Sequence, residues 1–405
     1  MSRSAERRRT PSLPSAAVLA LAAATAVVVA AQAEEWRPLF NGRDLAGWVN
    51  VNCAPGTFSV RDGLIHSTGA PICALRTDRM YENFELELEY QHLKPGGNAG
   101  LFIWADALPA RGQPFLRAIE VQILDGRNGE NYTSHGDVFP IHGAKMTPDR
   151  PHPGGWMRSL PRERRAKPAG QWNHYRIVAN RGTISLAVNG KEVTTGSEAS
   201  PRKGYIALES EGSPTLFRNI RIRELPPGPS LRPDQIASAD EGFRSLYTGV
   251  DLQGWKVTAT HEGRWTVKDW TLVYSPAQSA ATGSADEGMQ LESAGLFGNV
   301  IVRFDWWVPK GTSLPAAVPL HAAPFDADGG RILLTPIPVG SGPETGGGWH
   351  RTELTVRGRE YLLTMDGEGA RGGTIPGPSG RRRPLVLNPA DVPVEFANIF
   401  VKPLN

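Results

Sequence analysis

The chain has 405 residues, of which 44 are Lys or Arg and 41 are Asp or Glu, and 40% are hydrophobic. Residues 34–405 have 40 basic and 40 acidic side chains, so their formal net charge is zero. Without a basic excess the chain lacks the electrostatic footprint of a nucleic-acid binder, and we expect no nucleic-acid partner. The length exceeds what one hydrophobic core usually serves, which favours two domains.

The first 33 residues have the three-part layout of a secretory signal peptide. A basic stretch at 7–9 precedes an apolar run at 16–31, and residues 31–33 read Ala-Gln-Ala, an A-x-A cleavage site. The apolar run is shorter than the roughly 20 residues that span a bilayer, and no later segment is long and apolar enough. We therefore expect cleavage before Glu34 and a secreted or periplasmic protein without a membrane span.

Cys53 and Cys73 are the two cysteines of the chain. Export makes a disulfide chemically permissible, and we expect these two residues to pair. Closing a loop of about 20 residues would contribute roughly 3 kcal/mol to stability in the chain-entropy account. The alternative is a pair of buried thiols.

An internal repeat divides the chain. Residues 34–48 read EEWRPLFNGRDLAGW and residues 241–255 read EGFRSLYTGVDLQGW, with Arg, Leu, an aromatic residue, Gly, Asp-Leu and Gly-Trp in the same order. Further matches follow downstream: Trp172 with Trp349, Asn189-Gly190 with Asp366-Gly367, and Phe217-Arg218-Asn219-Ile220 with Phe396-Ala397-Asn398-Ile399. We therefore expect two copies of one module, 34–225 and 241–405. The Pro-rich segment 226–240 between them predicts an extended, semi-rigid linker.

The local patterns within each copy are those of β-strands. Residues 84–90 alternate strictly between apolar and charged side chains, which indicates a strand with one buried face. Asn189-Gly190 lies between two apolar runs and predicts a hairpin with a type I′ turn. Convincing amphipathic helices are absent after residue 33, and Gly and Pro punctuate the chain densely. The fold class is therefore all-β, with two tandem jelly-roll sandwiches favoured over a barrel.

Six motifs in a fixed order link the first copy to a known family. They are LFNGRDLAGW (39–48), DGLI (62–65), GGNAGLFIW (96–104), IEVQILD (119–125), WNHYRI (172–177) and LFRNIRIREL (216–225). Together they make residues 34–225 resemble the 3-keto-disaccharide hydrolase domain family. The resemblance implies a concanavalin-like or laminarinase-like β-sandwich that acts on 3-keto-glycosides, by hydrolysis or by a lyase and hydratase sequence.

The second copy keeps the scaffold motifs but lacks the polar centre of the family. Its counterpart of 119–125 is approximately 331–336, which contains no carboxylate at the matching place. We therefore expect 241–405 to be a degenerate copy that serves as a scaffold or binding module. His321, Asp326 and Asp328 leave an independent site as an alternative.

The strand 119–125 holds the first candidate site residues. Its alternation places Ile119, Val121 and Ile123 on one face, and Glu120 and Gln122 about 7 Å apart on the other. A carboxylate and an amide on one face can line a sugar-binding groove, and the resemblance favours this reading over a solvent-exposed face.

The segment 134–145 gathers two imidazoles, a carboxylate and an ammonium group. His135, His142 and Lys145 are candidates for a base, an acid or an electrostatic partner. His135, Asp137 and His142 are weak candidates for holding a divalent cation, and we expect no organic cofactor. The alternative is ordinary loop polarity.

Five further residues are candidates for substrate binding. Glu209 and Glu211 lie at i and i+2 on a predicted strand and hence on one face, with a solvated edge as the alternative. Asn98 and Trp104 belong to the GGNAGLFIW motif, and Asp125 ends the polar strand. For Trp104, sugar stacking competes with core packing. Trp48 matches Trp255 in the second copy, and Trp172 matches Trp349. This recurrence in a copy without the polar residues favours structural roles for Trp48, Trp172 and Trp255.

The implied substrate suggests a mechanism. A ketone at C3 acidifies the proton at C2, so expulsion of the C1 substituent needs one base and a group that holds the developing enolate. Ordinary glycosidases need two carboxylates about 5.5 Å or about 6.5–9.5 Å apart. Glu120 could form such a pair only with Asp125 at a bend or with Glu211 from a neighbouring strand. We therefore favour elimination, with Glu120 or His142 as the base and Lys145 or His135 as the electrostatic partner. The alternatives are a non-catalytic carbohydrate-binding protein, a laminarinase-like glycosidase, or a structural role.

Overall fold

The computed structural model describes residues 35–125, 135–276, 288–312, 324–336 and 346–405. The expected signal peptide and His321 lie outside these ranges. Within them the chain is all-β, and its helical segments are two short 3₁₀ turns, η1 (Pro233–Gln235) and η2 (Ala259–His261). The predicted fold class is therefore confirmed. No helix of the described ranges is both long and apolar enough to cross a bilayer.

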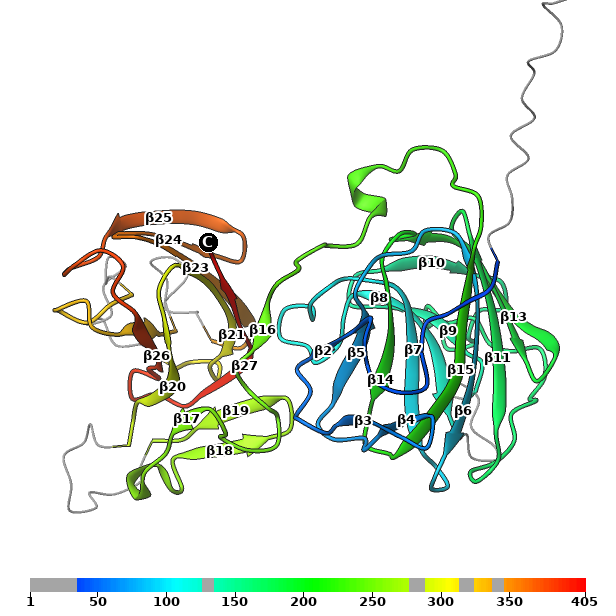
Figure 1. The fold of residues 1–405 in the computed structure, drawn as a ribbon, viewed down its shortest axis with the longest axis horizontal. Helices are drawn as coiled ribbons and strands as arrows, with labels where there is room; N and C mark the ends of the chain where they lie inside the picture. The colour runs from blue at the N-terminus through cyan, green and yellow to red at the C-terminus, as the bar shows by residue number, and fades with distance from the viewer. Residues whose placement is uncertain (1–34, 126–134, 277–287, 313–323, 337–345) are drawn as a thin grey trace, which may run out of the picture.

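Two sheets form the N-terminal sandwich, which we define as strands β1–β15 (Figure 1). The larger sheet has the order β10 (Lys145–Pro148), β13 (Lys191–Ser200), β12 (Thr183–Val188), β11 (Asn173–Asn180), β6 (Phe84–His92), β15 (Thr215–Glu224), β4 (Leu64–Ser67) and β3 (Phe58–Arg61), with β1 (Arg37–Pro38) also on β15. The smaller sheet has the order β2 (Trp48–Val51), β5 (Cys73–Thr77), β14 (Tyr205–Ser210), β7 (Asn98–Ala105), β8 (Ala118–Leu124) and β9 (Val138–Ile141).

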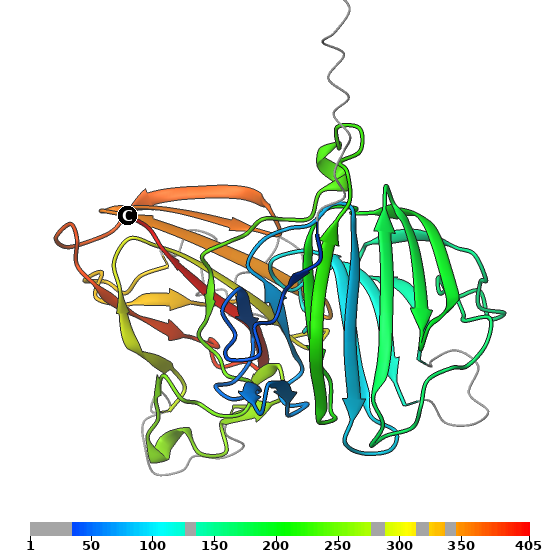
Figure 2. The same cartoon turned by 45° about the vertical axis from the view of Figure 1, so that its right-hand side comes forward.

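Two further sheets form the C-terminal sandwich, strands β16–β27, which lies beside the first in two views (Figures 1 and 2). Its larger sheet has the order β18 (Trp265–Lys268), β19 (Thr271–Tyr274), β27 (Val394–Pro403), β21 (Val300–Trp307), β23 (Trp349–Arg357), β24 (Glu360–Met365) and β25 (Glu368–Thr374), with β16 (Arg244–Ser245) also on β27. Its smaller sheet has the order β17 (Trp255–Lys256), β20 (Leu291–Phe297), β26 (Arg383–Leu387) and β22 (Ile332–Leu334).

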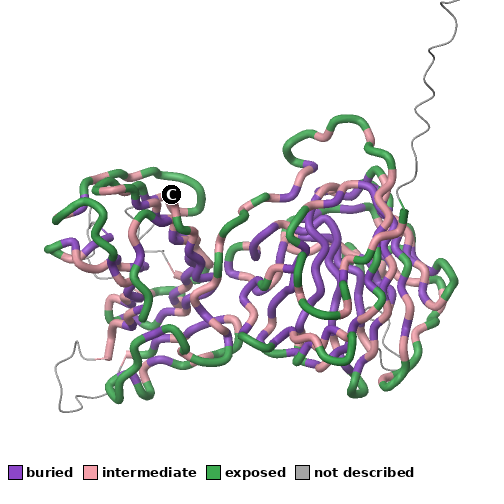
Figure 3. The backbone as a smooth tube through the Cα atoms, viewed as in Figure 1, coloured by how far each residue is buried: buried purple, intermediate pink, exposed green. Residues whose placement is uncertain are grey.

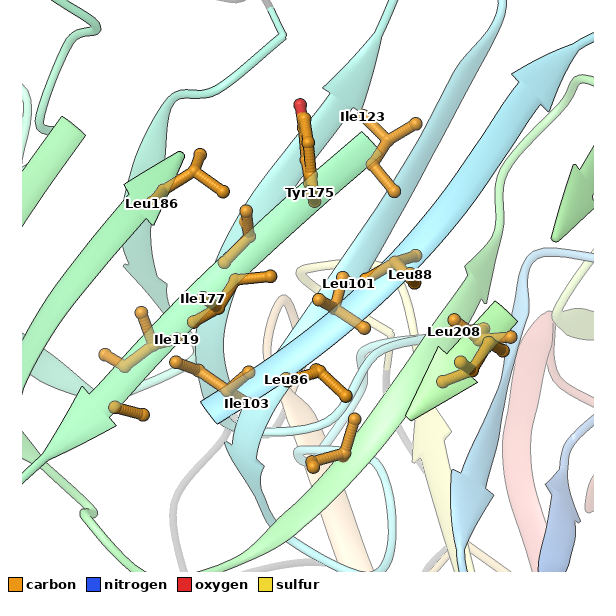
Figure 4. Close-up of a cluster of buried hydrophobic side chains, with 14 of the residues drawn as sticks. Leu86, Leu88, Leu101, Ile103, Ile119, Ile123, Tyr175, Ile177, Leu186 and Leu208 are labelled. Atoms are coloured by element: carbon orange, nitrogen blue, oxygen red, sulfur yellow. The ribbon is translucent and has the colours of Figure 1, made fainter. Parts of the chain in front are cut away.

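The core of each sandwich lies between its two sheets. In β6, Leu86 and Leu88 are fully buried, whereas the alternating Glu85, Glu87 and Glu89 point away from the core. They meet Leu101 and Ile119 of the smaller sheet in one apolar cluster (Figure 4). The tube view shows the same pattern, with buried residues concentrated in the strands and exposed residues in the turns (Figure 3). Strict alternation in the sequence is therefore what builds the sandwich.

The Asn189-Gly190 turn confirms the hairpin prediction. Both residues have positive φ, 48° and 85°, as a type I′ turn requires, and β12 and β13 pair on either side of it. The Pro-rich segment 226–240 differs from the expected extended linker. It contains η1 and is fixed to the first sandwich by main-chain hydrogen bonds between Ala237 and Lys203 and between Arg202 and Gln235.

Matched hydrogen bonds occur at repeat-related positions of the two sandwiches. The indole of Trp48 donates to the Leu39 carbonyl at 2.8 Å, and that of Trp255 donates to the Leu246 carbonyl at 3.1 Å. The main-chain amide of His174 donates to the Asn189 side chain, as that of Arg351 donates to the Asp366 side chain. The amide of Ile206 donates to Thr77, as that of Leu385 donates to Ser293. The matching residues Asn219 and Asn398 both have positive φ. This geometry supports the repeat that the sequence predicts.

The predicted disulfide is not formed, and this is a correction. Cys53 and Cys73 are both free thiols. The Cys53 thiol donates to the carbonyl oxygen of Ala74 at 3.2 Å, while burial, followed by the neighbouring Cys53, raises the pKa of Cys73 well above its ordinary value. The two thiols are neighbours, but Cys53 is engaged with the main chain of β5.

The two matched indole hydrogen bonds generate a first prediction. Trp48→Phe and Trp255→Phe should each lower the free energy of unfolding by about 1–3 kcal/mol, because each leaves a carbonyl without its donor. Denaturant unfolding of the full chain measures both. A loss at Trp48 with none at Trp255 would contradict equivalent roles for the two indoles.

Candidate active site

A polar row crosses the six-stranded sheet on the face away from the inter-sheet core. In β8, Ile119, Val121 and Ile123 are fully buried in the core, so Glu120 and Gln122 project from the opposite face as predicted. That face is nevertheless covered, since Glu120 is 6% exposed and Gln122 is 3% exposed. The solvent-exposed alternative is therefore wrong.

Neighbouring strands bring further candidates to the same face. Register pairs Phe102 of β7 with Glu120, and an isolated bridge pairs Asn98 with Glu211. The Asn98 amide donates to the Glu211 carboxylate, and the Gln122 amide donates to the Asn98 carbonyl oxygen at 2.7 Å. A hydrogen-bonded chain of two amides thus connects β8 to the end of β14.

Gly100 of β7 provides the space between two carboxyl groups. A Cβ atom at this position would lie 2.7 Å from Glu209 Oε2 and 3.1 Å from Glu120 Oε1. Both carboxyl groups therefore crowd over the same glycine, one from each neighbouring strand. Glu209 is 1% exposed, and its carboxyl group lies within hydrogen-bond reach of that of Glu211, with no amide or guanidinium donor among the described residues.

This crowding changes the protonation of the cluster. Burial, reinforced by the negative charge of Glu211, raises the pKa of Glu120 to about 8. Burial and the neighbouring Glu120 also hold the pKa of Glu209 well above its ordinary range, and burial raises that of Glu211. Like charges this close in a low-dielectric site disfavour ionisation. The site therefore stores protons near neutral pH and can act as an acid or a base.

Arg158 is a functional candidate that was not predicted from the sequence. Its guanidinium donates to the fully buried carboxylate of Asp137 at 3.1 Å and lies 3.5 Å from the ring centre of Phe139. Phe139 pairs with Glu120 across β8 and β9, and the positive charge of Arg158 favours ionisation of Glu120. A cation thus stands beside the carboxyl cluster.

His135 and Asp125 lie on the other side of the sheet, which corrects their placement in the polar groove. His135 Nδ1 is 2.8 Å from the hydroxyl of Tyr90, a core residue. Burial lowers the pKa of His135 to about 3, and its Nε2 is 4.0 Å from the Asp125 carboxylate. Asp125 accepts a hydrogen bond from the Gly96 amide at 2.9 Å. Both side chains support the end of β8.

His142 and Lys145 have different outcomes. His142 is half-buried beside the Phe115 ring, with 6.5 Å between ring centres, and Phe115 packs on Phe102. Lys145 is exposed on the edge strand β10 of the nine-stranded sheet, where it pairs with Ser200. Lys145 is therefore on the other sheet from Glu120, which corrects its assignment to the site.

Trp104 is a core residue, so the sugar-stacking alternative is wrong. Its side chain is fully buried, its indole donates to the Glu82 carbonyl at 2.7 Å, and its ring meets Phe84 edge-on at 6.2 Å. Trp104 has a φ of 52° at a register shift between β7 and β14. This irregularity explains why alternation along β7 did not predict its direction.

The proposed cation ligands do not converge. His135 faces the core, Asp137 is paired with Arg158, and His142 lies beside Phe115. In the described ranges, no three His, Cys, Asp or Glu side chains are grouped so that they could hold a metal ion.

A separate groove of about 570 Å³ lies on the outer face of the nine-stranded sheet. Its charged lining is largely engaged in ion pairs, such as Arg221 with Glu87 at 2.5 Å and Arg218 with Glu89 at 2.5 Å. Because its carboxylates Glu87 and Glu89 are each paired with an arginine, the face of Glu120 is the stronger candidate site.

The described residues of the C-terminal sandwich do not reproduce the carboxyl cluster. Strand pairing places Leu387 opposite Leu291 as Leu208 lies opposite Leu75, so Asn388 occupies the position of Glu209. Strand β22 runs parallel to β26, just as β8 runs parallel to β14, but β22 pairs with β26 directly, whereas β7 lies between β14 and β8. Asp326 is bound to Arg331 at 2.9 Å.

Each of the comparisons with known proteins below covers just under half of the chain. Residues 35–223 match the model of the 3-keto-alpha-glucoside-1,2-lyase-like domain. A 3-keto-disaccharide hydrolase of Bacteroides thetaiotaomicron is 24% identical over 245 residues, covering 48% of this chain and 79% of the relative. Among solved structures, a chain described as a glycosyl hydrolase from Parabacteroides distasonis is 21% identical with a TM-score of 0.38, covering 48% of this chain and 95% of that one. A carbohydrate-binding module from Bacillus subtilis is 12% identical with a TM-score of 0.33, covering 44% of this chain and 96% of that one.

The raised pKa of Glu120 generates a prediction on stability. The carboxyl group ionises near 4.5 in the unfolded chain but near 8 in the fold, so the fold binds the extra proton between these values. The free energy of unfolding should therefore fall as pH rises through this window, by at most about 1.4 kcal/mol per pH unit for this group. Glu120→Gln should reduce that slope, whereas Glu192→Gln on exposed β13 should not. Equal slopes in wild type and Glu120→Gln, measured by denaturant unfolding from pH 5 to 8, would contradict the shift.

Proposed function

Because residues 35–223 belong to the 3-keto-alpha-glucoside-1,2-lyase-like domain family, we propose that this chain cleaves 3-keto-glycosides at the Glu120 face. The observation that carries the proposal is the buried carboxyl cluster around Gly100, in which Glu120 has a pKa of about 8. A carboxylate with a raised pKa is a stronger base than an ordinary one and is matched to a carbon acid. We also propose, from residues 1–33, that the protein is exported and meets its substrate in the periplasm or outside the cell.

The chemistry requires one base and one stabiliser of negative charge. Ionised Glu120 takes the proton from C2, and the electrons of that C–H bond delocalise onto the C3 ketone oxygen as an enolate. The enolate collapses to a C1–C2 double bond as the bond from C1 to the aglycone oxygen breaks. The leaving oxygen takes a proton from a neutral carboxyl group of the cluster. Addition of water, with OH to C1 and H to C2, completes a net hydrolysis.

Arg158 replaces Lys145 and His135 as the electrostatic partner. It is the cation whose charge acts on Glu120, and it is fixed by Asp137 beneath Phe139. A guanidinium so positioned can stabilise a developing enolate. Asn98 and Gln122 are already hydrogen-bonded to the cluster, and they are suited to orienting sugar hydroxyls. His142 is a second candidate base, since burial lowers its pKa and keeps the imidazole neutral.

The second candidate function is a laminarinase-like glycosidase, because the structure brings Glu120 and Glu209 to one face. Such an enzyme requires one ionised carboxylate as a nucleophile or base beside a protonated acid. The pKa of Glu209 is raised well above its ordinary range, so a neutral Glu209 beside an ionised Glu120 also meets this requirement. Elimination is preferred because of the family match, and the substrate test below separates the two functions.

One experiment separates these functions and the binding-only alternative. The purified chain is incubated in deuterated water with a 3-keto-glucoside and, separately, with the unoxidised glucoside, and products are followed by NMR. Cleavage of the keto substrate alone, with deuterium at C2, supports elimination and hydration. Cleavage of the control substrate alone supports the glycosidase, and saturable binding without product supports a carbohydrate-binding role.

Substitution of the base generates a prediction. Glu120→Gln should lower kcat by at least about 10³-fold with the fold intact, since the amide cannot accept the C2 proton. Lys145→Ala is the matched control and should stay within about twofold of wild type, because Lys145 lies on an exposed strand of the other sheet. Turnover by Glu120→Gln at the wild-type rate would remove Glu120 from the mechanism.

The pH profile supplies another prediction. If Glu120 acts as the base, kcat/KM should rise with pH and level off above about 8, where the carboxylate is ionised. Glu211→Gln should move this midpoint to lower pH, because the negative charge of Glu211 is a cause of the shift. Glu192→Gln on exposed β13 serves as the control. A profile that falls with pH through the same range would instead identify Glu120 as an acid.

A further inference from the structure

The loop between β7 and β8, residues 106–117, contacts the C-terminal sandwich through its main chain. Three side chains of the C-terminal sandwich bind its main-chain atoms, and Asp366 forms an ion pair with the Arg111 side chain. Asp305 accepts from the Gly112 amide at 2.8 Å, Arg351 donates to the Pro109 carbonyl at 2.9 Å, and the Asn398 amide donates to the carbonyls of Ala110 at 3.3 Å and Gln113 at 3.0 Å. Main-chain contacts of this kind fix the path of a loop whatever its side chains are.

The binding side chains are themselves held rigidly. Asp305 is fully buried and accepts from Arg351 Nε at 2.7 Å, from Arg351 Nη2 at 2.8 Å and from Asn398 Nδ2 at 2.7 Å. Asn398 is 2% exposed, and its oxygen accepts from the Asn52 amide at 2.7 Å. A buried charge with this many donors has one low-energy arrangement, so the network is preorganised rather than adaptable.

The opposite side of the loop covers the face that carries Glu120. Phe115 packs edge-on against Phe102 with 5.6 Å between ring centres, and Phe102 is the register partner of Glu120. Leu116 is fully buried in the same apolar cluster, to which the C-terminal sandwich contributes Phe400. One loop therefore connects the two sandwiches to the candidate active site.

We propose that the C-terminal sandwich is a support that positions the 106–117 loop over the Glu120 site, with Asp305 and Asn398 as its positioning residues. The proposal has an activity arm, the effect of the loop on catalysis, which rests on the proposed function. It also has a structural arm, the effect of the C-terminal sandwich on the order of the loop, which does not. The support acts through Phe115 and Leu116, which exclude water from the carboxyl cluster and so maintain its raised pKa values.

A comparison of the two sandwiches explains why only the second can hold the loop. Arg218 of β15 covers the Trp172 ring, with its guanidinium 3.8 Å from the ring centre. The repeat-related residue in the C-terminal sandwich is Ala397, which has no guanidinium to place over a ring, and the ring of Trp349 lies beside that of Trp270 with 5.6 Å between ring centres. Gly112 packs on this ring so closely that a Cβ atom would lie 2.1 Å from Trp349 Cγ. A small residue at 397 and a glycine at 112 are complementary.

The chain offers a matched pair of variants for the test. Asn398 and Asp269 both have positive φ, 50° and 51°, and both side chains reach across the interface. Asn398→Gly removes the hydrogen bonds to the loop together with those to Asp305 and Asn52, whereas Asp269→Gly removes the side-chain hydrogen bond to the Ile72 amide. Glycine accepts positive φ without strain, so the substitutions differ mainly in which contact is lost.

Hydrogen–deuterium exchange of the full chain measures the structural arm. Asn398→Gly should speed exchange of amides in 106–117 by about tenfold or more, while Asp269→Gly should leave them unchanged. Gly112→Ala is a second variant, made from the loop side, and should have the same effect because its Cβ would collide with Trp349. Unchanged exchange in both loop-directed variants, or equal acceleration in Asp269→Gly, would overturn the proposal.

The activity arm uses kcat/KM on the 3-keto-glucoside. Asn398→Gly and Gly112→Ala should lower it by about tenfold and shift the pH midpoint downward as water reaches Glu120, with Asp269→Gly near wild type. Faster loop exchange with an unmoved pH midpoint and wild-type turnover would overturn positioning of the site. If the wild-type chain does not turn over the substrate at all, the proposed function fails, and the exchange measurement still decides whether the loop depends on the C-terminal sandwich.

Discussion

The burial of carboxyl groups side by side on one sheet face is the constraint that the N-terminal sandwich must accommodate. Removing a carboxylate from water is costly, and a second one beside it adds repulsion. The structure resolves this by keeping the groups partly protonated and by giving them amide partners and one cation. Gly100 is part of the same solution, because any larger residue there would displace the two carboxyl groups. The cluster thus depends on a rigid sheet that cannot relax away from it.

Much of this arrangement could be predicted from the sequence where the backbone is regular. Alternation along 119–125 placed Glu120 and Gln122 on one face, and the same rule placed Glu209 with Glu211. The two pairs meet because β14, β7 and β8 lie side by side in the sheet, and no local sequence pattern specifies that order. Asn98 was found through its motif, and its bridge to Glu211 shows what holds it there.

The errors fall where the backbone leaves the regular pattern. Trp104 has positive φ at a register shift, so its ring turns into the core. His135 follows the end of β8, where alternation no longer applies, and it bonds to Tyr90. Arg158 comes from an irregular segment joined to β9 by a bridge between Val138 and Ser159. The charge of Arg158 acts on Glu120 because the fold brings two distant parts of the chain together, and no residue spacing in the sequence predicts this. The cysteine prediction used the expected compartment and the loop length, neither of which fixes the direction of a thiol.

The two sandwiches show how one scaffold can take on different tasks. Both have the indole hydrogen bonds and the hairpin turns. Both also have a hydroxyl side chain, Thr77 or Ser293, that accepts a hydrogen bond from a main-chain amide of the neighbouring strand. At the Glu209 position the C-terminal sandwich has Asn388, which carries no charge to bury. At the Arg218 position it has Ala397, and Gly112 of the N-terminal sandwich packs on the ring of Trp349. These two differences lie on different sheets, because Asn388 follows β26 and Ala397 lies in β27.

This separation has an energetic consequence for the whole chain. Strained electrostatics lower the stability of the sandwich that carries them, and a loop over such a site is drawn from the least stable part of a fold. Four hydrogen bonds from the neighbouring sandwich hold the loop from outside the sandwich that carries the carboxyl cluster. Because they reach main-chain atoms, they leave Phe115 packed on Phe102 and Leu116 buried beside it. On the proposal made above, the C-terminal sandwich would thus support the site from a distance, through the loop.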